Sequence, residues 1–142
     1  MESWATHLIT FLIGTATGAA GNYFANKYTD QRRDKEAKKK EIDSIQKIIR
    51  IMPELIQEMK KDFNAPEYIA VRELVLLPNK KVAFNGGGIK RFIYYEDEHT
   101  DLRGKISILE NYDFLTDITP GNAPIFRISE KFWNTVRKLP EI

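Results

Sequence analysis

The chain has 142 residues, a formal net charge of +2 at pH 7, two histidines and no cysteine. So small a charge argues against binding nucleic acid through clustered positive charge. The sequence has no cysteine, no pair of neighbouring histidines and no glycine-framed serine, so an enzyme is the weakest of the function classes, with carboxylate or Lys chemistry as the alternative left open. The lack of cysteine also fits a reducing cytoplasm.

The segment from Trp4 to Phe24 is mostly apolar and carries no Lys, Arg, Asp or Glu. A helix needs about 20 such residues to cross a hydrocarbon core about 30 Å thick, and this segment is about that long. Basic residues begin at Lys27, whereas only Glu2 precedes the segment. By the positive-inside rule, residues 1–26 are predicted to be a transmembrane anchor in the cell inner membrane, single-pass, with a cytoplasmic C-terminus.

Two alternatives compete with this anchor. A cleaved signal peptide would use a small-residue site such as Ala16 to Gly21, but its basic residues would precede the apolar run. A buried core helix of a soluble domain is the other, although core helices rarely run this long without a charge. Within the segment, Gly14, Gly18 and Gly21 fall on one helix face, which predicts close packing against another membrane helix, with simple flexibility as the alternative.

Residues 27–63 are predicted to form a helical stalk. Its first half is highly charged and rich in helix-forming residues, so we expect it to be solvated and to contact anionic headgroups at the membrane surface. The basic residues that would make this contact are Lys27, Arg32, Arg33, Lys35, Lys38, Lys39 and Lys40.

The second half of the stalk is amphipathic. Apolar residues recur from Ile42 to Phe63 at alternating steps of three and four, which is typical of a helix with one buried face. Pro53 predicts a kink or a new helix at that point. We expect this helix to pack on the domain that follows rather than to form a coiled coil.

Residues 64–142 are predicted to form one small α+β domain whose core includes the preceding helix. The expected elements, in chain order, are a short helix over 67–74, extended segments over 74–78 and 81–84, a strand over 90–95, a helix over 102–111, strands over 114–118 and 125–128, and a helix after Ser129.

Two polar clusters in this domain raise the question of a ligand. Glycines at 86–88 lie beside Lys90 but lack the Ser or Thr and the helix of a phosphate-binding loop, so a tight hairpin is expected there. Acidic residues and His99 lie within 96–101, where a metal site competes with capping of the next helix by Thr100 or Asp101. Capping is the prediction, and we expect no metal, cofactor or small-molecule substrate.

The run ISILENYDFLTDITPGNAPIFRISEKFWNTV, from Ile106 to Val136, resembles the end of winged-helix domains. It has a helix, a strand, a wing turn at 119–124, a return strand and a helix starting at Ser129. The whole layout is also similar to that of uncharacterised small bacterial single-span membrane proteins. The resemblance implies that the helix before the wing, and the wing itself, form a recognition surface with Arg103, Lys105, Ser107, Thr119, Gly121 and Asn122.

This chain departs from DNA-binding winged helices in three ways. The wing has no Lys or Arg, an acidic run precedes the helix, and strands stand where the first helix of the helix-turn-helix pair belongs. We therefore expect an N-terminal transmembrane helix, a charged stalk and a winged-helix-like interaction domain, acting as a non-enzymatic adaptor or sensor. Its partners would be the bilayer and either another protein or a second copy. The alternatives are a membrane-tethered DNA-binding regulator and a small membrane-acting toxin or defence effector.

Overall fold

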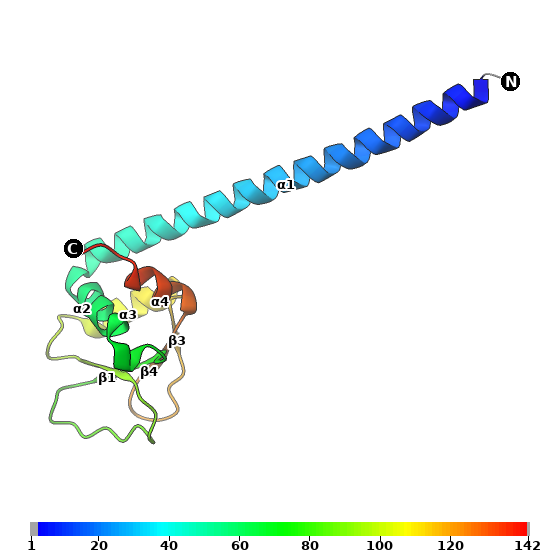
Figure 1. Ribbon diagram of the computed structural model, residues 1–142. Helices are drawn as coiled ribbons and strands as arrows, with labels where there is room; N and C mark the ends of the chain where they lie inside the picture. The colour runs from blue at the N-terminus through cyan, green and yellow to red at the C-terminus, as the bar shows by residue number, and fades with distance from the viewer. Residues whose placement is uncertain (1–2, 142) are drawn as a thin grey trace. The chain divides into compact units, whose positions relative to one another are not determined.

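The computed structural model describes the backbone of residues 3–141 and the side chains from residue 20 to residue 141. The chain is α+β and divides into two compact units, Met1–Asp43 and Ser44–Ile142. The elements are α1 (Ser3–Ile51), α2 (Pro53–Asn64), the 3-10 helix η1 (Pro66–Tyr68), β1 (Glu73–Leu77), β2 (Phe92–Tyr95), α3 (Leu102–Asn111), β3 (Leu115–Asp117), β4 (Ile125–Ile128) and α4 (Glu130–Arg137) (Figure 1).

The first unit is part of the long helix α1, which confirms that the charged segment is helical. Every side chain from residue 20 to residue 40 is exposed. Arg32 and Glu36 form an ion pair of 3.0 Å across one turn, and such an exposed pair adds only a few tenths of a kcal/mol.

None of the helices, as far as their residues are described, is long and apolar enough to cross a membrane. Most of the predicted anchor, including Gly14 and Gly18, lies in residues 1–19, whose side chains are outside the described part.

Pro53 ends α1 and begins α2, as predicted. Met52 between the helices has φ −138° and ψ 58°, and Pro53 occupies the first turn of α2, where its missing N–H does not break a helical hydrogen bond. The apolar face continues across the break, since Ile45, Ile48 and Met52 are buried together with the inner face of α2. The compact unit therefore begins at Ser44, whereas the sequence-based boundary is at residue 64.

The amphipathic helix packs on the sheet domain, which confirms that expectation. Ile48 and Leu55 are both 0% exposed and belong to the same core cluster as Leu74 of β1 and Phe132 of α4. Because these side chains are buried in the core of their own unit, they do not form the seam of a coiled coil.

The second unit is built on a four-stranded sheet of order β2-β1-β4-β3. β1 lies in the middle, parallel to β2 and antiparallel to β4, and Leu74 is in register with Phe92 on one side and Phe126 on the other. Leu74 and Leu76 point to the helices α2, α3 and α4, which lie over one face of the sheet (Figure 1). Aromatic stacking of Phe63 on Trp133, at 4.4 Å between ring centroids, joins α2 to α4 in this core.

The other face of the sheet carries a smaller cluster. Val75, Leu77 and Ile125 are buried there beneath Phe84 and Ala123, which come from the two long loops of the unit. Strand alternation explains the division, because successive side chains of β1 point to opposite faces. β1 is consequently buried on both sides.

The tight hairpin expected at 81–95 is wrong. Residues 81–84 form no strand, and β2 pairs with β1 in parallel. A parallel pair requires a long crossover, and residues 78–91 supply it without a helix. The turn at 85–88 does exist: the Gly87 N–H donates to Asn85 Oδ1 at 3.1 Å, and Gly87 and Gly88 have φ of 62° and 79°.

The remaining predicted elements fall close to where they were expected. α3 and β4 have the predicted bounds, and β3 and β2 are shorter than predicted by a residue or two at their ends. Ser129 caps α4 by accepting a hydrogen bond from the Phe132 N–H at 3.2 Å. The helix expected over 67–74 is confined to η1, because the chain straightens into β1 at Glu73.

Candidate functional site

The predicted recognition helix is α3, and its basic side chains are not gathered for binding a phosphate. Arg103 and Ser107 are exposed on one face of α3, and Lys105 is partly buried. Nε and Nη2 of Arg103 both donate to Glu96 Oε1, at 3.0 and 2.8 Å. The charge of Arg103 is therefore already matched within the protein.

The acidic run before α3 is accounted for by contacts within the protein. Asp101 caps α3 by accepting a hydrogen bond from the Gly104 N–H at 3.3 Å, which confirms the capping prediction. Glu96 binds Arg103, and Glu98 forms an ion pair with Lys80. Among the residues that the structure describes, no three His, Asp or Glu side chains come together as a metal site would require.

The wing is a real β-hairpin turn, but it is folded onto the sheet. The Ile125 N–H donates to Thr119 Oγ1 at 3.0 Å, and the Thr119 N–H donates to Asp117 Oδ1 at 2.8 Å. Hydrogen bonding from the Thr119 side chain, and after it from the Thr119 N–H, lowers the pKa of the Asp117 carboxyl. The Leu76 N–H donates to the Pro124 carbonyl at 3.0 Å, so the wing extends the pairing of β4 with β1.

The wing and the glycine-rich loop together enclose a cleft, which we call the wing cleft. It has a volume of about 370 Å³ and includes Gly121 and Asn122 from the predicted site. The other lining residues are Phe84, Asn85, Gly86, Gly87, Arg91, Pro120, Ala123 and Ile125.

Arg91 at the wing cleft holds the fold together. Its side chain is 10% exposed, its Nε donates to Glu73 Oε2 at 2.8 Å, and its Nη1 donates to the Gly86 carbonyl at 3.0 Å. These bonds fasten the crossover loop to β1. Because Glu73 neutralises Arg91, the cleft offers no unmatched cation to an anionic ligand.

A second polar cluster lies between α2 and the segment that follows β2. His99 is 8% exposed, and its Nε2 lies 2.8 Å from Glu58 Oε2. The Tyr94 hydroxyl donates to Asp62 Oδ2 at 3.1 Å. Burial raises the pKa of Tyr94 well above its ordinary value, and burial likewise raises the pKa of Asp62 against the opposing effects of Tyr94 and Lys61.

Asp62 makes a testable contribution to the pH dependence of stability. Its raised pKa means that the folded state binds the proton more tightly than the unfolded state does. Relative to Asp62→Asn, the wild type should therefore gain stability as the pH falls from neutral through the folded pKa of Asp62 towards the ordinary carboxyl range. Urea unfolding of both proteins across this range measures the difference, and a constant difference would contradict the expectation.

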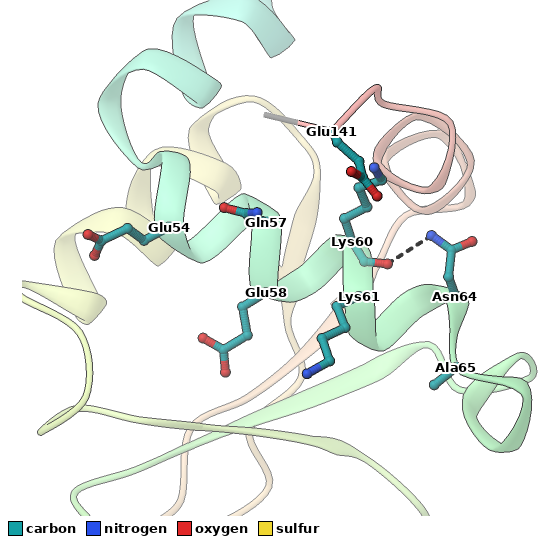
Figure 2. A pocket seen from close by; sticks show the side chains of 8 residues that line it. All are labelled: Glu54, Gln57, Glu58, Lys60, Lys61, Asn64, Ala65 and Glu141. Carbon is teal, nitrogen blue, oxygen red and sulfur yellow. Dashed lines mark hydrogen bonds between the residues drawn. The ribbon is translucent and has the colours of Figure 1, made fainter.

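An open cleft of about 910 Å³ runs along the solvent side of α2 towards Glu141 (Figure 2). Figure 2 shows that its side chains have mixed charge, with carboxylates from Glu54 and Glu58 and amines from Lys60 and Lys61. Asn64 Nδ2 donates to the Lys60 carbonyl at 2.8 Å, which continues the helical pattern of bonding. The arrangement is that of a solvated helix surface and brings no nucleophile and base together.

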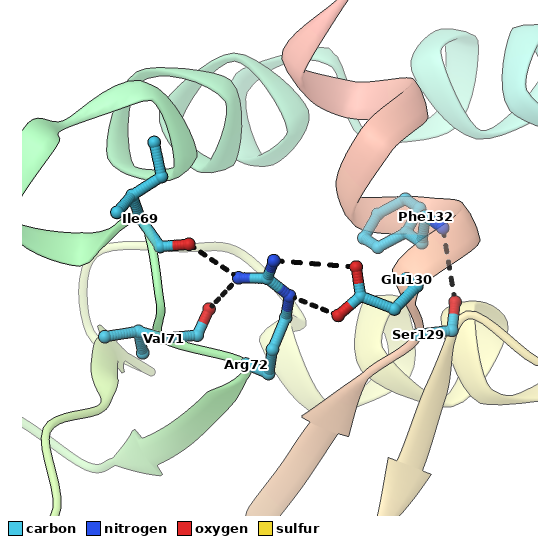
Figure 3. A network of polar contacts seen from close by, with 6 residues as sticks. All are labelled: Ile69, Val71, Arg72, Ser129, Glu130 and Phe132. Carbon is cyan, nitrogen blue, oxygen red and sulfur yellow. Dashed lines mark hydrogen bonds and ion pairs between the residues drawn. The ribbon is translucent and has the colours of Figure 1, made fainter.

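Arg72, just before β1, joins the segment after η1 to α4 through the polar contacts drawn in Figure 3. Nη1 donates to the carbonyls of Ile69 and Val71 at 2.9 and 3.0 Å, and Nε donates to Glu130 Oε1 at 2.7 Å. The guanidinium carbon also lies 3.9 Å from the ring centroid of Trp133. Arg72 thus fastens the start of β1 to the first turn of α4.

Replacing Arg72 with alanine should lower the free energy of unfolding by about 2 kcal/mol, because charge-assisted bonds and a cation–π contact are lost together. Arg72→Lys should recover less than half of the loss, since an ammonium group lacks the planar fork that bonds the carboxylate and both carbonyls. Urea titration followed by Trp133 fluorescence, in a Trp4→Phe background, measures both. Full rescue by lysine would contradict this role.

The basic residues of the stalk, Lys27 to Lys40, are exposed on α1 and do not form one stripe. Neighbouring residues of a helix are about 100° apart, so these side chains are distributed around the axis. At Gly21, an added Cβ would meet no atom within 4 Å.

Sequence reasoning missed Arg72, Arg91, Glu58 and Asp62. The last two carry a signal in hindsight, because their spacing of four places both carboxylates on the same side of α2. No family model, curated protein or solved structure matches this chain.

Proposed function

We propose that this chain is a membrane-anchored, non-enzymatic adaptor or sensor that presents a small winged-helix-like interaction domain at the cytoplasmic face of the inner membrane. The observation that carries the proposal is a wing without a basic residue, packed onto its own sheet rather than projecting as a phosphate-binding loop. Surfaces of this kind favour protein partners over nucleic acid.

The order of elements supports a winged-helix-like domain. α2 precedes β1, α3 precedes the hairpin of β3 and β4, and β4 lies between β1 and β3. This arrangement resembles the helices, wing and three-stranded sheet of that class. β2 and its crossover occupy the place of the first helix of the helix-turn-helix pair, which weakens the analogy to DNA-binding members.

The charges around α3 support a protein partner. Arg103 is bound to Glu96, and Asp97 and Asp101 are exposed just before the helix. A DNA backbone approaching the N-terminus of α3 would meet these carboxylates. Binding to DNA gains most of its affinity from cations that neutralise phosphates, and this surface supplies few.

Exposed aromatic residues support the membrane anchor. Tyr23, Phe24 and Tyr28 are 63%, 55% and 71% exposed, and Lys27 lies among them. Aromatic rings beside basic residues at the end of an apolar helix are typical of the membrane interface. Lys and Arg just beyond it would each gain about 1 kcal/mol near anionic lipid.

The test uses the full-length protein with two sets of vesicles, one of phosphatidylcholine alone and one also containing phosphatidylglycerol. We expect the protein to float with both sets after a wash in alkaline carbonate, and to be eluted from a column of double-stranded DNA by low salt. A protein left in the soluble fraction would contradict the anchor. DNA retention with a steep salt dependence would favour the tethered regulator, and release of a trapped dye would favour a membrane-disrupting effector.

A further inference from the structure

The edge of the sheet at β2 has backbone groups without a partner among the described residues. The Glu96 N–H donates to the Leu77 carbonyl at 2.9 Å, so the parallel ladder is made by Phe92, Tyr94 and Glu96 on the β2 side. The N–H and C=O of Ile93 and the N–H of Tyr95 therefore point away from β1. The Tyr95 carbonyl accepts a bond from the Glu98 N–H at 3.2 Å, where the strand ends.

A groove runs along this edge, and we call it the edge groove. Its volume is about 340 Å³. One wall comes from Glu58 and Asp62 of α2 with Tyr68 of η1, and the other side carries Ile93, Tyr95 and Lys80. Ile93 is 40% exposed, although the residues on either side of it in the strand, Phe92 and Tyr94, are buried.

The helix wall of the edge groove is acidic. Glu58 Oε2 lies 2.8 Å from His99 Nε2, and Asp62 Oδ2 accepts a hydrogen bond from the Tyr94 hydroxyl at 3.1 Å. A carboxylate can accept about four hydrogen bonds, so both retain capacity towards the groove. Burial raises the pKa of Asp62, and the hydrogen bond from Tyr94 and the charge of Lys61 do not cancel this effect.

Lys80 does not supply that cation. Its ammonium group forms an ion pair with Glu98 and lies 5.5 Å from the ring centroid of Tyr95, on the other side of the groove. Arg91 is likewise occupied by Glu73 and the Gly86 carbonyl. Among the described residues that line the edge groove, no Lys or Arg thus forms an ion pair with Glu58 or Asp62, and the basic group nearest Glu58 is His99, which lies outside the lining.

We infer that the edge groove binds an extended segment of a partner protein, which adds to the sheet beside β2 and places a Lys or Arg side chain against Glu58 and Asp62. Backbone bonds to Ile93 and Tyr95 would supply affinity, and the basic side chain would supply specificity. Since alternate residues of a strand face opposite sides, the residues flanking the Lys or Arg would lie towards Ile93, where apolar or β-branched side chains fit. The inference rests on the proposed function only in that the folded unit binds protein.

The test selects short peptides from a random phage-displayed library on the immobilised full-length protein. We expect enriched sequences to alternate β-branched residues with a single Lys or Arg, and synthetic copies to bind Ile93→Pro about tenfold or more weakly, because proline lacks the outward N–H. Ile93→Val keeps that N–H and a similar surface, and should bind like wild type. Selected peptides that bind Ile93→Pro as well as wild type would overturn the inference.

Charge is tested separately, so that the result does not depend on the folding of the proline variant. The double variant Glu58→Gln, Asp62→Asn keeps hydrogen-bonding side chains at both positions and should weaken the basic peptides by about tenfold. The same double variant should not change the affinity of synthetic peptides in which Gln replaces the Lys or Arg. Equal effects on both peptide sets, or enrichment of acidic peptides, would overturn the inference.

Three further outcomes bear on this inference, and the last two separate it from the proposed function. A wild-type dimer that becomes monomeric in Ile93→Pro would show that a second copy occupies the edge, which overturns the assignment to a partner protein. Flotation with vesicles without any selected peptide would reject the edge groove and leave the membrane adaptor standing. If selected peptides bind but the protein does not float with vesicles, the membrane anchor is rejected and the edge groove stands.

Discussion

Replacing Ile48 with aspartate is expected to unfold the Ser44–Ile142 unit. Ile48 is 0% exposed and lies in the core cluster with Leu55, Leu74 and Phe132, although it belongs to the helix that precedes the sheet domain. Loss of a buried isoleucine costs about 2–5 kcal/mol, and a buried carboxylate without a partner adds further cost. Small domains have only about 5–15 kcal/mol in total, so little or no stability should remain.

Trp133 reports the outcome, because its indole is 1% exposed in the same core. In a Trp4→Phe background, its emission should move to longer wavelength in Ile48→Asp without any denaturant, whereas the parent should show a cooperative urea transition. The result decides whether the last turns of α1 are part of the folded unit.

Ile42→Asp is the matched control. It makes the same substitution on the same helix, but Ile42 is 56% exposed. Its free energy of unfolding should stay within about 0.5 kcal/mol of that of the parent, as is usual at exposed sites. An Ile48→Asp protein that unfolds at the same urea concentration as Ile42→Asp would show that the domain holds together without α1.

The elements set by local chemistry could be predicted from the sequence. Pro53 starts α2 because proline fits only the first turn of a helix, Ser129 caps α4, and Asp101 caps α3. The apolar spacing up to Phe63 also identified the face that packs on the domain. For Pro53, Ser129 and Asp101, the residue that gives the signal and the helix end that it sets lie within a few residues of each other.

The path of β2 could not be predicted in this way. Glycines at 86–88 between two extended segments are typical of a hairpin, and the turn itself forms, but which strand β2 joins is decided by β1. β1 has buried side chains on both faces, which favours a position in the middle of the sheet with a neighbour on each side. Pairing over such a distance leaves no trace in the spacing of residues 81–95.

The polar contacts that hold these elements together could not be predicted from the sequence either, because they join residues that are far apart in the chain. Arg72 reaches Glu130, and Arg91 reaches Glu73, across long stretches of chain. From the sequence alone these arginines are indistinguishable from the exposed Arg127. The predicted wing residues Gly121 and Asn122 do line a cleft, but its other side is the glycine-rich loop, which the winged-helix analogy does not include.

Introducing arginine at Leu12 and Ile13 together should release the full-length protein from membranes. Both positions lie near the centre of the uncharged segment from Trp4 to Phe24. On insertion scales, arginine at a helix centre costs about 2.5–3.5 kcal/mol while Leu or Ile contributes about −0.3 to −0.6, so the pair shifts insertion by about 6 kcal/mol or more. Because threonines and Asn22 already dilute this segment, such a shift should abolish its insertion.

The measurement is the fraction of protein that remains in the membrane pellet after carbonate extraction of cells expressing each variant. Ala25→Arg with Asn26→Arg is the matched control, because it adds the same charges just past the segment, on the side where the positive-inside rule favours them. The control should remain in the pellet like the parent, while the Leu12 and Ile13 variant moves to the supernatant with the urea transition of Trp133 unchanged. If all three proteins partition alike, the apolar segment is not what holds this chain at a membrane, and the adaptor would have to reach its partner by another route.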